Sequence, residues 1–265
     1  MEIIAIANQK GGVGKTTTSI NLASCLSNDK YKVLLIDLDP QGNCSQGINV
    51  DPTLQDKTID MLMLDPENVK DYIINTSIEN LDLIPANLNL AALESIVKNQ
   101  MIEEPNLLLK KVIEQDEIKN NYDYVIIDCP PSLSFLSLNA LNAANSVLIP
   151  IQCEYFALVA VAQILSVINQ IKVETNPNLD IAGFLLTMYD AKTTISTEIT
   201  TQVYKNFKEK TFKTIVPRNS SIPEGSARGI PVNFYKPNAK GSIAYNQLAK
   251  EVVNYVKDKE KRSHQ

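Results

Sequence analysis

The chain has 265 residues, of which 44% are hydrophobic and 21% are charged, as in an ordinary soluble globular protein. No apolar run is expected to reach the length of a membrane span, and the N-terminus does not read as a signal peptide, which argues against membrane-anchored and secreted classes. The four cysteines are scattered without a C-x-x-C pair, which argues against a disulfide framework or a zinc site and indicates a reducing, cytoplasmic setting.

The net charge of −5 conceals a division along the chain. Residues 1–189 carry 11 basic side chains against 23 acidic ones, whereas residues 190–265 carry 14 against 7. A segregated basic region can bind an anionic polymer, and it can equally be a solvated set of lysine-rich helices. Composition leaves these two interpretations about even.

Short apolar runs alternate with helical patterns along the chain. The predicted strands are Ile3–Ala7, Val33–Leu38, Leu81–Pro85, Tyr124–Cys129, Val147–Gln152, Ile181–Met188 and Thr214–Val216. The predicted helices are Thr16–Ser27, Leu88–Val97, Asn106–Ile118, Phe135–Ala144, Leu158–Val173, Ser196–Lys210 and Ser242–Lys259. Most strand runs are continuous, as expected where both faces of a parallel sheet are covered. We therefore predict a doubly wound α/β fold, with one mostly parallel sheet, helices on both faces and ligands at the carboxyl ends of the strands.

No repeat, low-complexity linker or break requires a second domain, so residues 1–265 are expected to form a single domain. The stretch Pro217–Gly241 is rich in proline and glycine, and we predict an extended surface loop there. The charged residues 257–265 are expected to be a frayed tail. This tail includes His264, the one histidine of the chain, to which we assign no catalytic role.

The most informative stretch, Asn8-Gln-Lys-Gly-Gly-Val-Gly-Lys-Thr-Thr-Thr18, lies between the first strand and the first helix. A glycine-rich loop in this setting turns backbone N–H groups toward phosphate oxygens, and the helix N-terminus adds positive charge. Within it, Lys15 is expected at the β and γ phosphates, Thr16 at a magnesium ion and Thr17 at the α phosphate. The expected phosphate-binding residues are Lys10, Gly11, Gly12, Val13, Gly14, Lys15, Thr16 and Thr17.

Two apolar strands end in aspartates that would complete such a site. Asp128 ends a Walker B-like strand and is expected to hold magnesium through its water shell. Asp37 and Asp39 lie two residues apart, so both can face the same site. We assign Asp39 to the attacking water and Asp37 to the magnesium shell or the loop. Taken alone, the segment Asp39-Pro-Gln-Gly is as readily a plain turn.

Three motifs together resemble the ParA/Soj partition ATPases, which belong to the deviant-Walker branch of P-loop proteins that also includes MinD. These motifs are Lys10-Gly-Gly-Val-Gly-Lys-Thr-Thr, Asp37-Leu-Asp-Pro-Gln-Gly-Asn and Ile126-Ile-Asp-Cys-Pro-Pro-Ser. The glutamine at position 9 departs from the strict Walker pattern, and it accompanies the additional lysine at position 10. Further matches at Pro150-Ile-Gln-Cys-Glu-Tyr-Phe-Ala-Leu, Leu186-Thr-Met-Tyr-Asp-Ala and Ile215-Val-Pro-Arg-Asn extend the resemblance over essentially the whole chain.

The resemblance implies a magnesium-dependent ATPase that is slow without a partner and forms an ATP-bound homodimer. Such a dimer would bind DNA without sequence preference, and a ParB-like centromere-binding protein would stimulate hydrolysis and release it. Cycles of this kind move plasmid or chromosome origins, so the resemblance places the protein in the cytoplasm, associated with the nucleoid. No membrane partner is expected.

Carried over by position, the resemblance also implies residue roles. Lys10 would reach the phosphates of the opposite subunit and act in catalysis with Lys15 and Asp39. A cation supplied in this way can accelerate phosphoryl transfer by several orders of magnitude, as arginine fingers do. The residues that would lie beside the adenine are Pro217, Arg218 and Asn219.

For DNA binding, Soj-like proteins place basic residues in an Asp-Ala-Arg-Thr segment and again shortly after Pro-Arg-Asn. In this chain Lys192 preserves the first charge, whereas Ser221 stands at the second position. We expect Arg228, Lys236 and Lys240, in the nearby loop, to compensate.

Three alternatives have different sequence requirements. A MinD-like nucleotide-gated membrane or scaffold ATPase would need a C-terminal amphipathic helix with bulky apolar residues, but Val252–Val256 is followed by charges without a Phe, Leu or Trp stripe. An iron–sulfur carrier would need converging thiolates, which the cysteine spacing does not supply. A scaffold that does not hydrolyse nucleotide is disfavoured because Lys10, Lys15 and Asp39 are all present.

Overall fold

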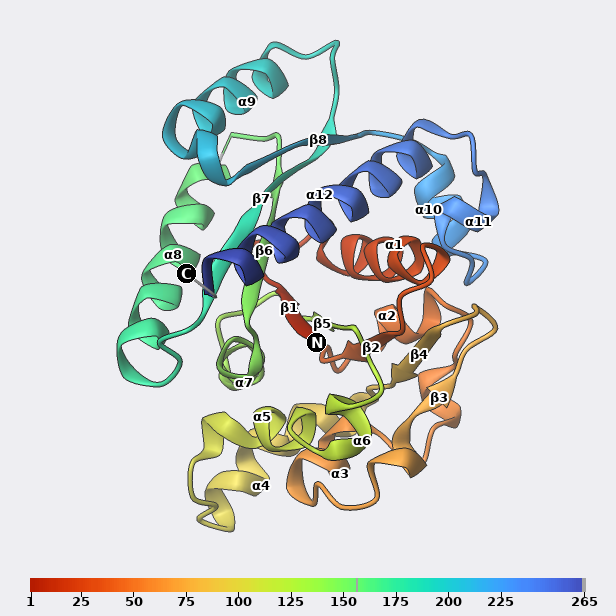
Figure 1. The fold of residues 1–265 in the computed structure, drawn as a ribbon, viewed down its shortest axis with the longest axis vertical. Helices are drawn as coiled ribbons and strands as arrows, with labels where there is room; N and C mark the ends of the chain where they lie inside the picture. The colour runs from red at the N-terminus through yellow and green to blue at the C-terminus, as the bar shows by residue number, and fades with distance from the viewer. Residues whose placement is uncertain (156, 264–265) are drawn as a thin grey trace.

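The computed structural model describes residues 1–155 and 157–263. Its strands are β1 Glu2–Ile6, β2 Val33–Asp37, β3 Ile74–Asn75, β4 Leu81–Ile84, β5 Tyr124–Asp128, β6 Ser146–Gln152, β7 Asp180–Tyr189 and β8 Thr211–Pro217. They form an eight-stranded sheet in the order β3-β4-β2-β5-β1-β6-β7-β8 (Figure 1). Neighbouring strands are parallel except β3, which pairs antiparallel with β4.

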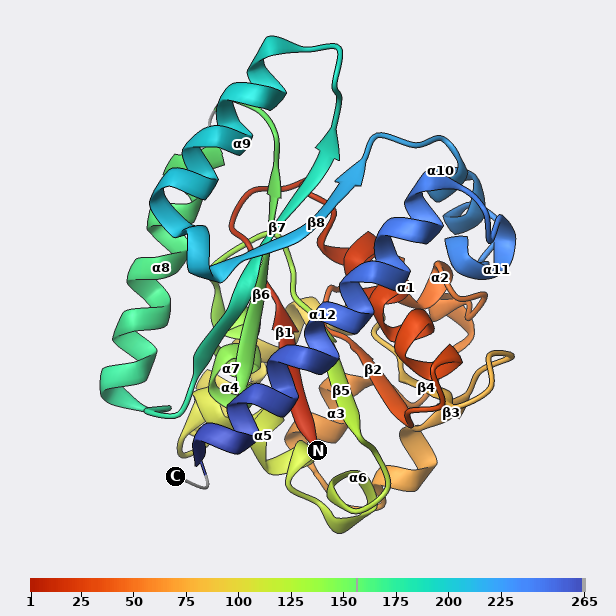
Figure 2. The same cartoon turned by 45° about the horizontal axis from the view of Figure 1, so that its top comes forward.

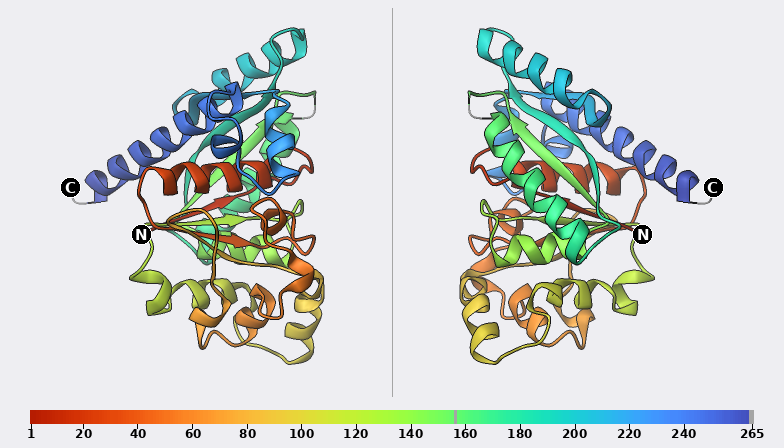
Figure 3. Two further views of the ribbon diagram at one scale, coloured as in Figure 1. Left: turned by 90° about the vertical axis from the view of Figure 1, so that its right-hand side faces the viewer. Right: turned by 90° about the vertical axis from the view of Figure 1, so that its left-hand side faces the viewer.

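Helices cover both faces of this sheet, as Figure 3 shows with the sheet seen edge-on. The α-helices are α1 Lys15–Asn28, α2 Asn43–Gln46, α3 Ile59–Leu64, α4 Leu93–Asn99, α5 Leu108–Ile113, α6 Asp116–Lys119, α7 Phe135–Ala143, α8 Ala157–Glu174, α9 Thr194–Phe207, α10 Ser221–Ser226, α11 Val232–Tyr235 and α12 Lys240–Ser263. Short 3₁₀ helices are η1 Pro52–Leu54, η2 Val69–Tyr72, η3 Leu88–Ala92, η4 Pro105–Leu107 and η5 Lys208–Lys210.

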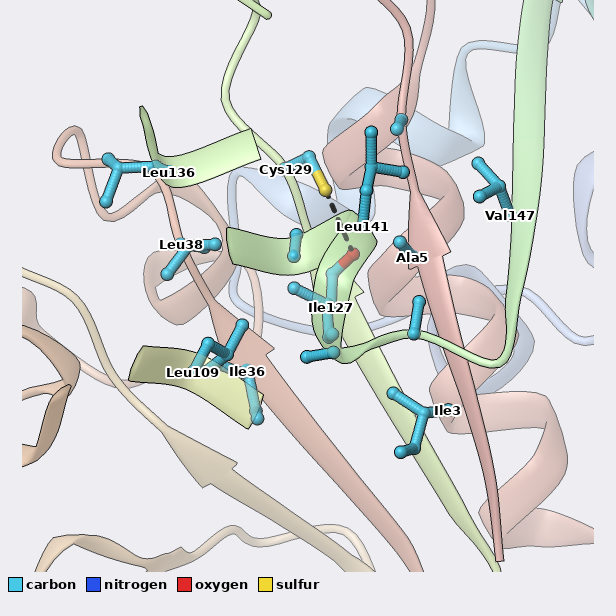
Figure 4. Close-up of a cluster of buried hydrophobic side chains, with 14 of the residues drawn as sticks. Ile3, Ala5, Ile36, Leu38, Leu109, Ile127, Cys129, Leu136, Leu141 and Val147 are labelled. Carbon is cyan, nitrogen blue, oxygen red and sulfur yellow. Dashed lines mark hydrogen bonds between the residues drawn. The ribbon is translucent and has the colours of Figure 1, made fainter. Parts of the chain in front are cut away.

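The core consists of two apolar layers, one on each face of the sheet. Along β1, Ile3 and Ala5 pack in the layer that includes α3, α5, α7 and α8, while Ile4 and Ile6 pack in the layer that includes α1 and α12. Figure 4 shows part of the first layer, where the thiol of Cys129, just after β5, lies 3.9 Å from the carbonyl oxygen of Ile127. Because both faces of the central strands are buried, their apolar runs are continuous, which confirms the predicted doubly wound arrangement.

Three local predictions are wrong. The predicted loop Pro217–Gly241 contains the short helices α10 and α11, which pack against α12 and α1. The predicted helix Asn106–Ile118 is interrupted at residues 114–115 and forms α5 and α6. The predicted frayed tail is helical through residue 263, where α12 ends, and Lys259 within it pairs with Glu2 at 2.8 Å. Residues 264–265 lie outside the described part of the chain.

Helix α8 also corrects the expectation that no apolar run reaches the length of a membrane span. Its 18 residues have a mean hydropathy of 1.4, long and apolar enough by length and composition alone. Core helices pass the same test, and the inner side of α8 packs into the apolar layer through Val161, Ile164 and Ile168.

Candidate functional site

The glycine-rich loop connects β1 to α1 at the carboxyl edge of the sheet (Figure 2). Gly12 and Gly14 have φ angles of +75° and +90°, which residues with a side chain rarely adopt. Gly14 is also the N-cap residue of α1, so the loop passes directly into the helix N-terminus. Gly11 has no such requirement, because a Cβ there would meet only Pro131, at 3.8 Å. The loop therefore has the backbone shape that phosphate binding needs.

Lys15 points back into this loop. Its Nζ atom donates a hydrogen bond to the Lys10 carbonyl oxygen at 3.3 Å, and only 6% of the residue is exposed. Burial lowers the pKa of Lys15, an effect that the nearby charges of Asp128 and Asp39 oppose. A poorly solvated ammonium ion at the centre of the loop is well suited to receive a polyanion.

The aspartates at the ends of β2 and β5 lie side by side. Asp37 and Asp128 are opposite each other in the parallel register, and both are fully buried. Burial raises the pKa of Asp37 to about 6. Burial, followed by the charge of Asp37, raises the pKa of Asp128 to about 7. Two adjacent carboxyl groups that are both shielded from water repel each other when both are ionised. Such a pair therefore favours binding either a proton or a cation.

The two carboxyl groups differ in how their oxygens are satisfied. Asp37 accepts hydrogen bonds from the backbone N–H (2.9 Å) and hydroxyl (2.7 Å) of Ser45, on α2, and from the Asp39 N–H at 3.2 Å. Asp128 accepts a bond from the Ser19 hydroxyl at 2.8 Å through Oδ1, while its buried Oδ2 has no partner among the described residues. The Asp128 carboxylate is therefore the group with an unused ligand atom.

These residues fit a magnesium ion. The Thr16 side chain acts on the pKa of Asp128 in the lowering direction, against the larger effect of burial, so the two groups belong to the same site. Hydroxyl and carboxylate oxygens are the hard ligands that magnesium prefers. The orphaned Oδ2 of Asp128 is a buried polar atom that such an ion or its water shell would satisfy.

Asp39 lies just beyond the end of β2, half-buried, and caps a tight turn by accepting a hydrogen bond from the Gln41 N–H at 3.0 Å. The segment is therefore a turn, as one of the two interpretations predicted, and the role of Asp39 toward a water molecule stays a prediction. The charge of Asp39 acts on the pKa values of Asp37, Asp128 and Lys15, which places its carboxylate among them.

A cavity of about 220 Å³ adjoins the loop and is lined by Gly14, Thr17, Thr187, Met188, Val216, Pro217, Arg218, Asn219, Ile222, Pro223 and Tyr245. The structure thus brings the three residues expected beside the adenine to the same cavity as the first turn of α1. Its walls are mostly apolar, as is usual for a site that accepts a nucleobase.

Sequence reasoning missed Met188 and Tyr245 in this cavity. Met188 has a φ angle of +52°, an uncommon conformation for a side chain of its size. Tyr245 comes from α12 and is fully buried, with its hydroxyl 3.4 Å from the Thr18 hydroxyl of α1. The only signal for Met188 was the family resemblance of the run Leu186-Thr-Met-Tyr-Asp. Nothing in the sequence indicates that Tyr245 lines this cavity.

Lys10 lies at the start of the loop, and its side chain pairs with a different group from that of Lys15. Its Nζ atom is 3.4 Å from a carboxylate oxygen of Glu154, in the connection between β6 and α8. The other oxygen of this carboxylate is 3.9 Å from the Arg218 guanidinium and accepts a hydrogen bond from the Gln152 side chain. Glu154 was not singled out from the sequence.

The four residues expected to bind DNA are all exposed, but they do not form one cluster. Arg228 and Lys236 converge on the ring of Tyr235, at 5.4 and 5.1 Å from its centroid, and Lys236 is bonded to Glu224 at 2.7 Å. Lys192 lies in the connection between β7 and α9, and Lys240 begins α12. Ser221, at the usually basic position, is buried at the start of α10.

Comparison with known proteins identifies relatives of nearly equal length. Residues 1–181 match the family model described as AAA domain. The chain is 44% identical to the sporulation initiation inhibitor protein Soj of Bacillus subtilis (95% of this chain, 98% of the relative), and 38% identical to the chromosome partitioning protein ParA of Caulobacter vibrioides (99% and 98%). The fold superposes with a TM-score of 0.86 on cobyrinic acid a,c-diamide synthase from Mycobacterium smegmatis with bound ATP analog and magnesium, at 33% identity and with 97% and 96% of the chains covered.

Proposed function

The chain belongs to the family of Soj and ParA partitioning ATPases, and from that premise we propose that it binds ATP with magnesium, closes into a homodimer and then holds non-specific DNA. A ParB-like centromere-binding protein would stimulate hydrolysis and release the dimer. We place this cycle in the cytoplasm, on the nucleoid. One sheet takes its strands from residues 2 to 217 and α12 packs against α1, so we treat the chain as one domain.

The observation that carries the proposal is the arrangement around Asp128. Its buried Oδ2 has no partner among the described residues, and it lies at the end of β5 beside Thr16 and close enough to Lys15 for their charges to interact. Magnesium bound there would neutralise charge that develops on the β and γ phosphates. Thr16 and Asp128 would hold the ion and its water shell, and Asp37 would act from the outer shell.

The remaining roles follow from position. We assign Lys15 and the backbone N–H groups of Gly11–Gly14 to the phosphate oxygens. The positive φ angles of Gly12 and Gly14, and the Lys15 ammonium group that lies against the loop carbonyl of Lys10, support this assignment. Asp39 orients the attacking water, since its carboxylate borders the site without being buried. The cavity beside Thr17 and Arg218 receives the adenine.

We propose that dimerisation brings the last catalytic group, Lys10, to the nucleotide of the neighbouring subunit. Lys10 stands at the outer rim of the loop with 29% of its side chain exposed, so it can extend toward a second subunit. Inserted at the neighbour's phosphates, its charge would stabilise the transition state and make hydrolysis depend on assembly.

DNA retention with different nucleotides tests the proposal. We expect the protein to be retained on non-specific duplex DNA with Mg-ATP and released with ADP or without nucleotide. The logarithm of the affinity should fall linearly with the logarithm of salt concentration, because phosphate contacts release counterions. Equal retention with ATP and ADP would contradict nucleotide gating.

A further inference from the structure

The ammonium group of Lys10 pairs with a carboxylate of its own chain. This group is 3.4 Å from Glu154 Oε2, and the two side chains are 29% and 47% exposed. The dimer described above needs the same ammonium group at the phosphates of a neighbouring subunit. One Lys10 Nζ atom cannot occupy both places, so the contact with Glu154 competes with dimerisation.

The backbone around this contact is anchored on both sides of the pair. The Lys10 N–H donates to the Asn8 side chain at 3.0 Å, and that side chain in turn donates to the Pro150 carbonyl at 2.7 Å, on β6. The Glu154 carbonyl accepts a hydrogen bond from the N–H of Ala157, the first residue of α8, at 3.0 Å. A change of partner by Lys10 therefore requires rotation of its side chain and leaves the loop in place.

Glu154 also connects two parts of the nucleotide site. While one of its oxygens contacts Lys10, the other lies 3.9 Å from the guanidinium of Arg218, a residue that lines the base cavity. The Gln152 side chain donates a hydrogen bond to this second oxygen and so orients the carboxylate. A single negative charge thus lies between the start of the phosphate loop and the wall of the base cavity.

We propose that Glu154 is the positioning residue of Lys10: it keeps the ammonium group folded back in cis in the ATP-free protomer, and dimer closure must displace it. This inference rests on the proposed ATP-dependent dimer. A partly exposed ion pair is weak, and one pair changes an equilibrium by up to about fivefold. The contact therefore delays closure without preventing it. Two such pairs break per dimer, so their removal should tighten the dimer by up to about 25-fold.

The test compares Glu154→Gln with Glu94→Gln, both in an Asp39→Ala background that blocks hydrolysis. Glu94 is a matched control because it is 46% exposed and pairs with Lys98 at 2.7 Å on α4, away from the site. Sedimentation velocity at saturating Mg-ATP gives the dimer dissociation constant. We expect this constant to fall by about 2- to 25-fold for Glu154→Gln and to stay unchanged for Glu94→Gln.

A second measurement reports on the ATP-free monomer. Acylation of Lys10 by a soluble N-hydroxysuccinimide ester, followed by mass spectrometry, should be faster in Glu154→Gln than in the parent, because the ammonium group loses its partner. A parent that stays monomeric with saturating Mg-ATP would refute the dimer itself, and with it this inference. A parent that dimerises, with an unchanged or weaker dimer in Glu154→Gln, or with unchanged Lys10 acylation, would refute the role of Glu154 alone.

Discussion

Asp37 and Asp128 are register partners on adjacent parallel strands, and both carboxyl groups are completely buried at the edge of the sheet where the glycine loop begins. Ser45 and Asp39 satisfy the oxygens of Asp37, whereas Oδ2 of Asp128 has no partner among the described residues. The pair is thus asymmetric: hydrogen bonds within the protein hold the Asp37 carboxylate, whereas the Asp128 carboxylate has an oxygen that is available to a ligand. This asymmetry agrees with the separate assignments that the sequence suggested for the two aspartates, Asp128 to the magnesium ion and Asp37 to its outer shell or to the loop.

The metal-free protein should become less stable as the pH rises from about 4 to about 7. An unfolded aspartate has a pKa of about 3.9, whereas the folded values are about 6 for Asp37 and about 7 for Asp128. Between these limits the native state holds protons that the unfolded state has released. The stability contributed by these groups is therefore fully present below about pH 4 and is lost as the pH rises through 6 to 7.

Thermal unfolding in EDTA at pH 5.5 and pH 7.5 measures this effect. Asp128→Asn removes the carboxyl group with the larger pKa shift. The difference in unfolding free energy between pH 5.5 and pH 7.5 should therefore be smaller in this variant than in the wild type, by on the order of 1 kcal/mol. Magnesium should restore stability at pH 7.5 in the wild type and fail to do so in Asp128→Asn. Equal pH dependence in both proteins would show that the pair does not retain its protons.

Lys15→Gln should weaken ATP binding by about 10- to 100-fold, because charge-assisted hydrogen bonds to phosphate contribute about 1.5–3 kcal/mol. The nucleotide-free variant should unfold at the same temperature as the wild type or higher, since burial already disfavours the Lys15 ammonium ion. Isothermal titration calorimetry and thermal unfolding provide the two measurements. The exposed Lys32→Gln is the control, and a variant at position 15 that binds ATP normally would remove Lys15 from the phosphate site.

Asp39→Ala should retain ATP and stop turnover. Asp39 borders the site but is not one of the residues assigned to the magnesium ion or the phosphates. Loss of its side chain should therefore leave ATP binding intact and lower kcat by about 10²- to 10⁴-fold, the usual range for loss of a proton acceptor. Phosphate release with the ParB-like partner measures the rate, and sedimentation with Mg-ATP should show a persistent dimer. Normal partner-stimulated hydrolysis in this variant would refute the assigned role.

Lys192→Glu combined with Arg228→Glu should abolish DNA retention while the ATPase activity without partner persists, because both side chains are exposed outside the nucleotide site. Lys236→Gln should have a smaller effect than Lys192→Gln, since Glu224 already neutralises Lys236 at 2.7 Å. Each lost phosphate contact should also reduce the salt slope by about one. Lys98→Glu on α4 is the control, and unchanged retention of the double variant would show that Lys192 and Arg228 do not contact DNA.

Much of the fold could be predicted because its determinants are local. The runs at residues 33–36 and 124–127 are apolar throughout, as expected for strands with both faces covered. The missed strand β3 has two residues, too few for any periodicity to be read. Helices α10 and α11 were predicted as loop for a similar reason. The six residues of α10 include a proline and a glycine, and the four residues of α11 are too few to show a helical pattern.

The sequence by itself determined the glycine loop, its two lysines and the aspartates at the strand ends, because backbone conformation and strand termination depend on residues close together in the chain. Only the tertiary structure decided which groups complete the site. Glu154 meets Lys10 across 144 residues of sequence, and Tyr245 meets Thr18 across 227. Contacts of this kind arise where the packed sheet and helices bring distant segments together, and no local pattern encodes them.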